Sequence, residues 1–364
     1  MKKQWLHSIL CCIGLWSLTA CTTVDLCPET EHPHAASIIV DYDWGEEEAD
    51  KPAHMNLFAA RKPNTWRING VVDTETGEVT TTELQEDSTE AVVPFKLRGG
   101  EYTLICINDY NGVSIDNLET FLTEPQAEAD TLFLRLEETP REELPELKGV
   151  NLPDFNPGYR YVPNIGRVFY ALEQGIRITT GQTETLHLSP YPISQAITIK
   201  FNIRTRGDVA VDSLIAEMSG VCGRMNIADA YLDTANLYRI IFRPTIEQTE
   251  ADLLTCTATF HALGIIPSPV ASYLNGPGIL QVAIYARSGD KKRIFHAGNN
   301  PRQDLLDADL TEKREDGRTY MKQTDPVEII LSGELVIDAN HIVNQDDSNF
   351  DTWFDSNINI DVDV

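Results

Sequence analysis

The sequence predicts an all-β protein: two antiparallel β-sandwich domains in tandem, with few short helices. Apolar and polar residues alternate with a period of two in segments along the whole chain of 364 residues, turn-forming residues separate these segments, and long helical periodicity is scarce. Because successive side chains of a strand point to opposite faces, each alternating segment is expected to be a half-buried strand. Many short strands joined by polar turns favour sandwiches, and sheets with one solvated face are typically antiparallel.

The chain begins with the features of an export signal. Lys2 and Lys3 precede an apolar run, 9–18, that is shorter than the roughly 20 residues needed to span a bilayer. The sequence Leu18-Thr19-Ala20-Cys21 then resembles the lipobox of bacterial lipoproteins, in which the cysteine is lipidated and becomes the new N-terminus. We therefore expect a signal peptide over 1–20 and a lipidated tether over 21–35. A plain secretory signal with a chance cysteine is the alternative.

The covalent lipid on Cys21 is the only non-protein group that the sequence leads us to expect, and no cofactor is expected. Each buried acyl CH₂ contributes about 0.8 kcal/mol, so several chains on one cysteine hold a folded body firmly on a membrane. Thr22, rather than Asp, follows Cys21, which is typical of outer-membrane lipoproteins. The acidic residues that come next resemble the tether with which Bacteroidetes send lipoproteins to the cell surface; they are Asp25, Glu29 and Glu31. The expected location is the outer membrane, lipid-anchored and exposed at the cell surface.

The first predicted domain spans 36–190. Its opening strand places apolar residues on one face and acids on the other: the apolar set is Ile38, Val40, Tyr42 and Trp44, and the acids are Asp41 and Asp43. A second alternating run follows at Leu132, Leu134 and Leu136. Gly99-Gly100 separates AVVPFKL from EYTLICIND and predicts a tight hairpin turn between two strands.

The second predicted domain spans 191–364. Pro190 and Pro192 mark the boundary, because proline is confined to linkers and strand edges. The strongest strand follows, with Ile197, Ile199, Phe201 and Ile203 on one face. Turns are expected at 288–290 and at Gly333, short helices at 246–254 and within 299–310, and a last strand at 357–364. That last strand could complete a neighbour's sheet, although the simpler expectation is that it closes its own domain.

The charge balance excludes two classes of partner. The formal net charge is −27, from 29 basic and 56 acidic residues. Such a surface repels nucleic acid backbones and anionic lipid headgroups. With 42% hydrophobic residues the chain is nevertheless a folded protein rather than an acidic tail.

Four cysteines remain after the signal peptide and the lipidated Cys21: Cys27, Cys106, Cys222 and Cys256. In an exported protein four cysteines permit two disulfides in three connectivities. Chain order favours Cys27–Cys106 and Cys222–Cys256, and four reduced thiols are the alternative. No CxxC occurs, which argues against redox or zinc chemistry.

The sequence has none of the common catalytic motifs, such as GxSxG, the P-loop, GxGxxG or HExxH. His32-Pro33-His34 lacks a third ligand, so no metal site is expected, and the acidic clusters are interpreted as solvated surface. The protein is therefore not expected to be an enzyme. A long loop, 137–166, carries aromatic residues that could contact a partner or sugar, or pack across the end of a sandwich. The predicted contact residues are Phe155, Tyr159, Tyr161 and, near the C-terminus, Trp353.

Several segments resemble a family of Bacteroides lipoproteins built on a domain of unknown function: Asp25-Leu26-Cys27, His32-Pro33-His34, Asp43-Trp44, Asn64-Thr65-Trp66-Arg67 and LRGGEYTLICIND. That family in turn resembles the fimbrillin-associated anchor subunits of Bacteroidales, and the segment 97–102 resembles the hairpin of their transthyretin-like sandwiches. The resemblance implies two transthyretin-like or Ig-like sandwiches in tandem. It also implies an anchor, assembly or accessory subunit of a fimbria-like adhesive structure, with fimbrillin-like or other surface proteins as partners. The alternative function is a glycan-binding outer-membrane lipoprotein of a nutrient-uptake system.

Overall fold

The structure is a computed structural model that describes residues 35–61, 66–84, 90–108, 112–124, 129–144, 160–273, 276–322 and 325–343. The expected signal peptide, almost all of the tether and the last predicted strand lie outside the described residues. So do several predicted site residues: Cys21, Cys27, Phe155, Tyr159 and Trp353. Within the described ranges, no helix has the length and apolar character needed to cross a bilayer.

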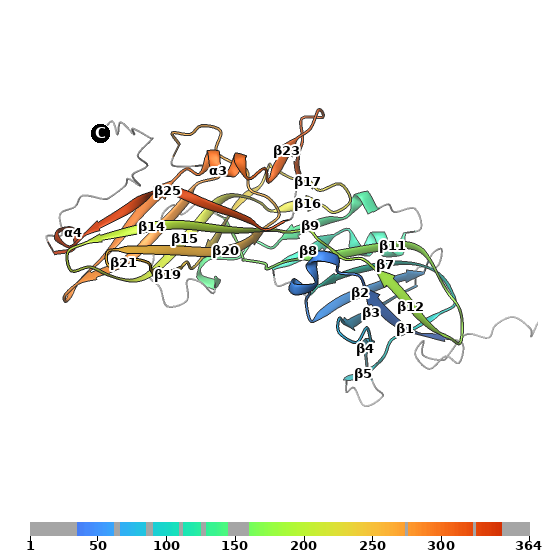
Figure 1. Ribbon diagram of the computed structural model, residues 1–364. Helices are drawn as coiled ribbons and strands as arrows, with labels where there is room; N and C mark the ends of the chain where they lie inside the picture. Colours follow the sequence, from blue (N-terminus) through green and yellow to red (C-terminus); the bar gives the residue numbers. More distant parts are fainter. Residues whose placement is uncertain are drawn as a thin grey trace, which may run out of the picture.

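The described chain is predominantly β, with a few short helices, and its elements group into two lobes (Figure 1). The strands up to Pro192 are β1 (Ala35–Tyr42), β2 (His54–Arg61), β3 (Trp66–Asp73), β4 (Val79–Leu84), β5 (Glu90–Pro94), β6 (Lys96–Arg98), β7 (Gly100–Asn108), β8 (Val113–Asp116), β9 (Phe133–Leu136), β10 (Tyr161–Val162), β11 (Phe169–Ile178), β12 (Thr183–Leu188) and β13 (Tyr191–Pro192). The later strands are β14 (Gln195–Arg206), β15 (Ala210–Cys222), β16 (Arg224–Asn226), β17 (Tyr231–Leu232), β18 (Leu237–Phe242), β19 (Thr245–Gln248), β20 (Leu253–Ala262), β21 (Leu280–Ser288), β22 (Lys291–Asn299), β23 (Thr311–Lys313), β24 (Thr319–Met321) and β25 (Val327–Asp338). The helices are η2 (Gly45–Asp50), α2 (Leu118–Thr123), η3 (Ala129–Thr131), η4 (Arg141–Glu143), α3 (Arg302–Asp307) and α4 (Ala339–Val343).

The first lobe has a three-stranded sheet, β12-β1-β6, and a seven-stranded sheet, β13-β11-β7-β2-β3-β4-β5. Its core joins residues of both sheets, among them Trp44, Met55, Phe95, Leu97 and Leu186. The predicted alternation of the opening strand is confirmed, since Ile38 and Val40 are buried and Asp41 is exposed.

The second lobe has a five-stranded sheet, β10-β18-β15-β21-β22, and a four-stranded sheet, β19-β20-β14-β25. Ile197, Ile199, Phe201 and Ile203 are all buried in one large core, as their spacing predicts. Apolar side chains from both sheets fill this core. In each strand, the apolar residues of the alternating pattern therefore lie on the face that packs against the opposite sheet.

A six-stranded sheet, β23-β24-β17-β16-β9-β8, combines strands from both halves of the chain. The predicted strand residues Leu132, Leu134 and Leu136 are buried here, and β9 pairs antiparallel with β16. Ile105 and Tyr170 of the first lobe also belong to the large core. Pairings therefore cross the division that the sequence predicts near 191, while Tyr191 and Pro192 themselves form an edge strand on β11.

The expectation of antiparallel sheets holds for most of the described strand pairs but not for all of them. Strand β1 pairs parallel with β12, and β14 pairs parallel with β25. Each lobe thus has one of its earliest strands beside one of its latest, which requires a long crossover. A third parallel pair joins β10 to β18. A period of two identifies a strand but contains no information on its direction, so the sequence pattern could not distinguish these pairs.

Two turn predictions are also corrected, and a third is confirmed. Gly99-Gly100 is no hairpin turn, because β6 pairs with β1 in one sheet and β7 lies in the other. Gly333 does not end a strand but lies in a bulge within β25, with a φ of 83°. By contrast, the 288–290 turn does join the antiparallel strands β21 and β22.

Of the two predicted helices, one is confirmed and one is wrong. Helix α3 lies within 299–310 as predicted. The segment 246–254 instead contains β19 and the start of β20. Over so short a stretch, its acidic and apolar residues fit both the period of a helix and that of a strand. The segment forms a strand because β19 pairs with β20.

Candidate functional site

Strand β25 is the first candidate interaction surface. It is 12 residues long and pairs with β14 on one side, and no described strand pairs with its other side. Ile330 is 63% exposed on this strand. The edge strand of the neighbouring sheet, β22, begins instead with Lys291 and Lys292, residues that discourage pairing with another chain. Although α3 lies beside β25 (Figure 1), the strand retains the features of an edge that can accept a further strand.

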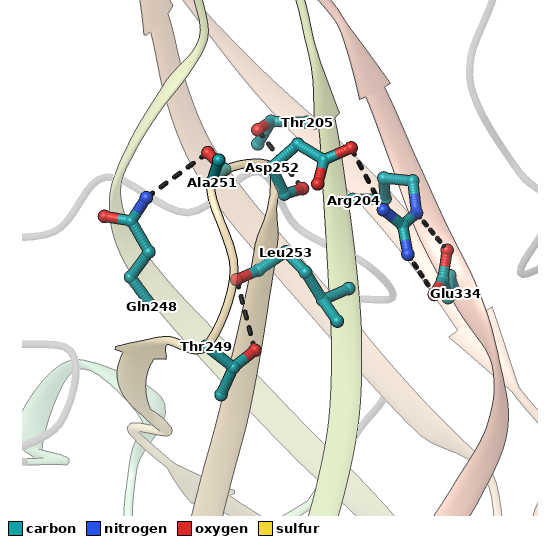
Figure 2. A network of polar contacts seen from close by, with 8 residues as sticks. All are labelled: Arg204, Thr205, Gln248, Thr249, Ala251, Asp252, Leu253 and Glu334. Atoms are coloured by element: carbon teal, nitrogen blue, oxygen red, sulfur yellow. Dashed lines mark hydrogen bonds and ion pairs between the residues drawn. The ribbon is translucent and has the colours of Figure 1, made fainter.

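An ion-pair network holds β25 onto β14 directly after the bulge. Arg204 donates from Nε to Glu334 Oε2 at 2.6 Å and from Nη2 to Oε1 at 2.9 Å. Its Nη1 donates to Asp252 Oδ2 at 3.0 Å. Figure 2 shows Arg204 between the two carboxylates, with Asp252 in the turn that leads into β20. Hydrogen bonds from Arg204 lower the pKa of the Glu334 carboxyl. The network therefore joins β14 to β25 and to the β19–β20 turn.

The second candidate surface lies under a segment that we call the strap, defined as described residues 137–144 and 160–162. Its second part contains β10, the edge strand of the five-stranded sheet, and Leu144 of its first part lies on the face of that sheet that points away from the large core. There Leu144 and Tyr161 pack against Ile215 and Ile241 in a small separate cluster. Tyr161 is only 3% exposed. Its ring therefore packs within the protein, which is the alternative to the predicted contact with a partner.

A buried polar network lies beneath the strap. Tyr161 donates its hydroxyl to Glu217 Oε2 at 3.1 Å, and Arg239 donates to Glu217 Oε1 and, at 3.0 Å, to Gln281 Oε1. Glu217 and Arg239 are both buried. Burial raises the pKa of the Glu217 carboxyl, and the charge of Arg239 opposes this rise. Each buried charge therefore has a partner, and these contacts help to fix the strap to the sheet.

A pocket of about 210 Å³ opens where the strap meets the start of β18. Its lining residues are Arg160, Ser219, Gly220, Leu237, Tyr238, Arg239, Gly276 and Pro277. Arg160 donates from Nε to Glu138 Oε2 at 2.8 Å, from Nη1 to Asn236 Oδ1 at 3.3 Å and from Nη2 to the Tyr238 hydroxyl at 2.5 Å. Its guanidinium carbon lies 4.4 Å from the centre of the Tyr238 ring. Polar and cation–π contacts therefore hold this wall of the pocket in place.

The floor of the pocket is a bulge in β15. Gly220 has a φ of 82°, and a Cβ there would lie 2.5 Å from Gly278 N. The Ser219 hydroxyl donates to Gly276 O at 2.6 Å and accepts from Ile279 N at 2.9 Å. Only glycine can occupy this crossing of two backbones, and Ser219 fixes the loop that forms the opposite rim.

The sequence did not predict this pocket, because its residues come from segments far apart in the chain. The one local signal was an isolated glycine, Gly220, inside an apolar strand pattern, which is typical of a bulge or of close backbone approach. Such a signal locates a bend, and the residues around it follow only from the pairing of β10, β15 and β18.

The described cysteines are buried free thiols: Cys106, Cys222 and Cys256. The predicted Cys222–Cys256 disulfide is therefore not formed in the structure. The two residues lie on β15 and β20, which belong to different sheets, and both pack in the large apolar core. The favoured partner of Cys106 was Cys27, which lies outside the described residues. Among the described residues, no three His, Cys, Asp or Glu side chains gather in a way that could hold a metal ion.

No protein-family model matches the sequence, and no curated protein matches it. Solved structures do resemble it. A candidate adhesin from Bacteroides ovatus has 10% identity and a TM-score of 0.44, covering 85% of this chain and 93% of that one. A candidate polysaccharide-binding protein from Bacteroides thetaiotaomicron has 10% identity and a TM-score of 0.38, covering 83% and 90%. The fimbrial anchor protein Mfa2 from Porphyromonas gingivalis has 13% identity and a TM-score of 0.34, covering 75% and 84%. The protein is structurally similar to these proteins.

Proposed function

We propose that the protein is a surface lipoprotein that acts as an anchor, assembly or accessory subunit of a fimbria-like adhesive structure. Lipid on Cys21 holds it in the outer membrane, and two transthyretin-like or Ig-like sandwiches stand in tandem outside the membrane. Its partners are fimbrillin-like or other surface proteins, and its role is to make contacts rather than to transform a substrate. The lipobox-like Leu18–Cys21 segment, the acidic composition and the resemblance to Bacteroidales anchor subunits support this proposal.

The observation that carries the proposal is the edge strand β25. A strand of 12 residues with hydrogen-bonded pairing on one side offers backbone donors and acceptors to an extended segment of a partner. Exposed Ile330 adds an apolar contact on the adjoining face. Arg204 and Glu334 keep β25 in register, so the edge is already formed before a partner arrives.

Site-specific photo-crosslinking in intact cells tests this role. A photoreactive amino acid replaces Ile330 in the full-length protein, and crosslinked partners are identified by mass spectrometry. The matched control replaces Val92, a residue 73% exposed on the edge strand β5 of the first lobe. We expect a crosslink to a fimbrillin-like subunit from position 330 and much less from position 92. The proposal fails if no such subunit is captured at position 330, or if both positions capture it equally.

A further inference from the structure

We infer that the pocket between the strap and the start of β18 binds a sugar residue that carries a carboxylate. Two of its lining residues are cations, Arg160 and Arg239, and no lining residue is acidic. The chain as a whole has 56 acidic and 29 basic residues, so this lining opposes the general charge of the protein. Each arginine is paired with a carboxylate, Arg160 with Glu138 and Arg239 with Glu217, but these carboxylates lie outside the lining, so the groups that face the pocket suit an anionic ligand.

The geometry of Arg160 matches a carboxylate. A guanidinium has five N–H donors, of which Nε holds one and each terminal nitrogen holds two. The contacts to Glu138, Asn236 and Tyr238 use one hydrogen on each nitrogen. One hydrogen then remains on Nη1 and one on Nη2, and two N–H donors of one guanidinium can bind both oxygens of a carboxylate. Because Arg160 is already held by three partners, ordering it for a ligand costs little further entropy.

The second arginine of the lining, Arg239, acts on a ligand through its positive charge. Arg239 is buried, and Glu217 and Gln281 bind it from the sheet side. Tyr238 accepts a hydrogen bond from Arg160, which leaves its own O–H able to donate to a ligand hydroxyl. The pocket thus offers a charged pair of donors and a neutral donor close together.

The size and the apolar walls point to a single sugar unit. Sites for drug-sized ligands enclose roughly 300–1,000 Å³, and this pocket has about 210 Å³. Leu237, Pro277 and Tyr238 supply apolar surface that an inorganic anion would leave uncovered. A pyranose acid has an apolar ring face, hydroxyls and one carboxylate, which is the combination that these walls complement. Such a residue would lie at the end or on a branch of a glycan.

The test is calorimetric titration of the full-length lipoprotein in detergent with glucuronic acid and with N-acetylneuraminic acid. Glucose, inorganic phosphate and an acetylated dipeptide with a free C-terminus are the comparison ligands. We expect saturable binding of at least one sugar acid, at least tenfold tighter than each comparison ligand. Absence of saturable binding of both acids overturns the inference, as does equal binding of glucose, phosphate or the dipeptide.

Variants locate the site. We expect Arg160→Ala to weaken binding of the sugar acid at least tenfold, Arg160→Lys to weaken it severalfold because the two-pronged contact is lost, and Tyr238→Phe to weaken it severalfold. The matched control is Arg135→Ala, which removes another exposed arginine that pairs with a carboxylate, Asp116, at 2.9 Å. Thermal unfolding checks that each variant is folded. Unchanged binding in folded Arg160→Lys and Tyr238→Phe contradicts the assignment. The inference does not depend on the fimbrial role, because it is measured on isolated protein whereas that role is tested by crosslinking in cells.

Discussion

Arg204 of β14 and Glu334 of β25 form a two-pronged ion pair, with hydrogen bonds of 2.6 and 2.9 Å, between two parallel strands of the second lobe. The pair lies where the register of the two strands shifts after the bulge at Gly333. Hydrogen bonding to Arg204 thus stabilises the strand that forms the candidate assembly edge at the position where its regular pairing is interrupted.

Glu334→Gln is expected to lower the free energy of unfolding by about 1 kcal/mol, since the pair is partly exposed. The pKa of Glu334 is lowered in the folded protein from its ordinary value of 4.5. The stabilising contribution is therefore present above pH 4.5 and is lost as the pH falls below it. Urea unfolding of both proteins at several pH values measures this. A difference between wild type and variant that stays constant from pH 7 to pH 3 would contradict the assignment.

Glu217 is expected to show the opposite pH dependence. Burial raises its pKa above the ordinary value of 4.5, so its contribution to stability is greatest below pH 4.5 and declines as the pH rises through the raised value. The comparison is the stability of wild type minus that of Glu217→Gln, followed from pH 4 to pH 8. This difference should fall with rising pH, whereas the corresponding difference for Glu334 should rise and then level off. If the two stability differences change with pH by the same slope, the distinction between the buried Glu217 and the exposed Glu334 is refuted.

Tyr161→Phe tests how the strap is attached. The substitution removes the hydroxyl that donates to Glu217 and leaves that buried carboxylate with one partner fewer. We expect a loss of about 1–3 kcal/mol in the free energy of unfolding. Hydrogen exchange should also become faster at Tyr161 and Val162, the residues that pair with β18. The matched control is Tyr320→Phe, whose hydroxyl binds the exposed carboxylate Asp316, and its effect should be smaller. Similar losses in both variants would show that the buried hydrogen bond contributes no more to stability than the exposed one.

Gly220→Ala should destabilise the protein by about 2–4 kcal/mol, because a side chain at positive φ is strained and its Cβ would overlap the backbone at Gly278. Gly289→Ala is the control. It has a φ of 53°, and a Cβ at this position would meet no atom within 4 Å, so only the backbone strain applies, about 1–2 kcal/mol. Thermal and urea unfolding measure both. If the two variants lose the same stability, the close approach of the two backbones is not a constraint.

The free thiols are expected to resist alkylation in the native protein. Burial raises the pKa of the Cys106, Cys222 and Cys256 thiols to about 12 each. At pH 8 almost no thiolate is then present to react with iodoacetamide. All three should react after denaturation without a reductant, as peptide mass spectrometry would show. A Cys222–Cys256 disulfide found in the exported protein would contradict the structure at this point.

The sequence pattern predicted those features of the fold that are encoded locally. The buried faces of Ile38 and Val40 in β1, and of Ile197 and Ile199 in β14, follow from a period of two that any strand displays. Strand direction does not follow from this period, so the sequence pattern could not predict the parallel pairs β1–β12 and β14–β25. The Gly99-Gly100 pair was mistaken for a hairpin turn because both a turn and a close approach require glycine. A Cβ on Gly99 would lie 2.5 Å from Thr180, a residue 81 positions away that local reasoning cannot place.

The candidate site was less predictable than the fold. Tyr161 was chosen for its aromatic ring in a long loop, but the ring packs on Ile215 and Ile241 beneath the strap. Arg160, its neighbour, lines the pocket instead. An arginine next to a tyrosine has no distinguishing pattern in sequence. Its role depends on β10 lying beside β18, which brings Arg160 to Tyr238 across 78 residues of chain.

Incorporation of a clickable palmitate analogue into the full-length protein in growing cells tests the central claim most directly. The account predicts a labelled protein in the outer-membrane fraction, and complete loss of label in Cys21→Ala with the protein still detected by antibody. Cys27→Ala is the matched control, since it removes a nearby cysteine outside the lipobox-like segment and should leave the label unchanged. An unlabelled wild-type protein, or equal labelling of wild type and Cys21→Ala, would contradict the proposal that lipid on this residue fastens an assembly subunit to the cell surface.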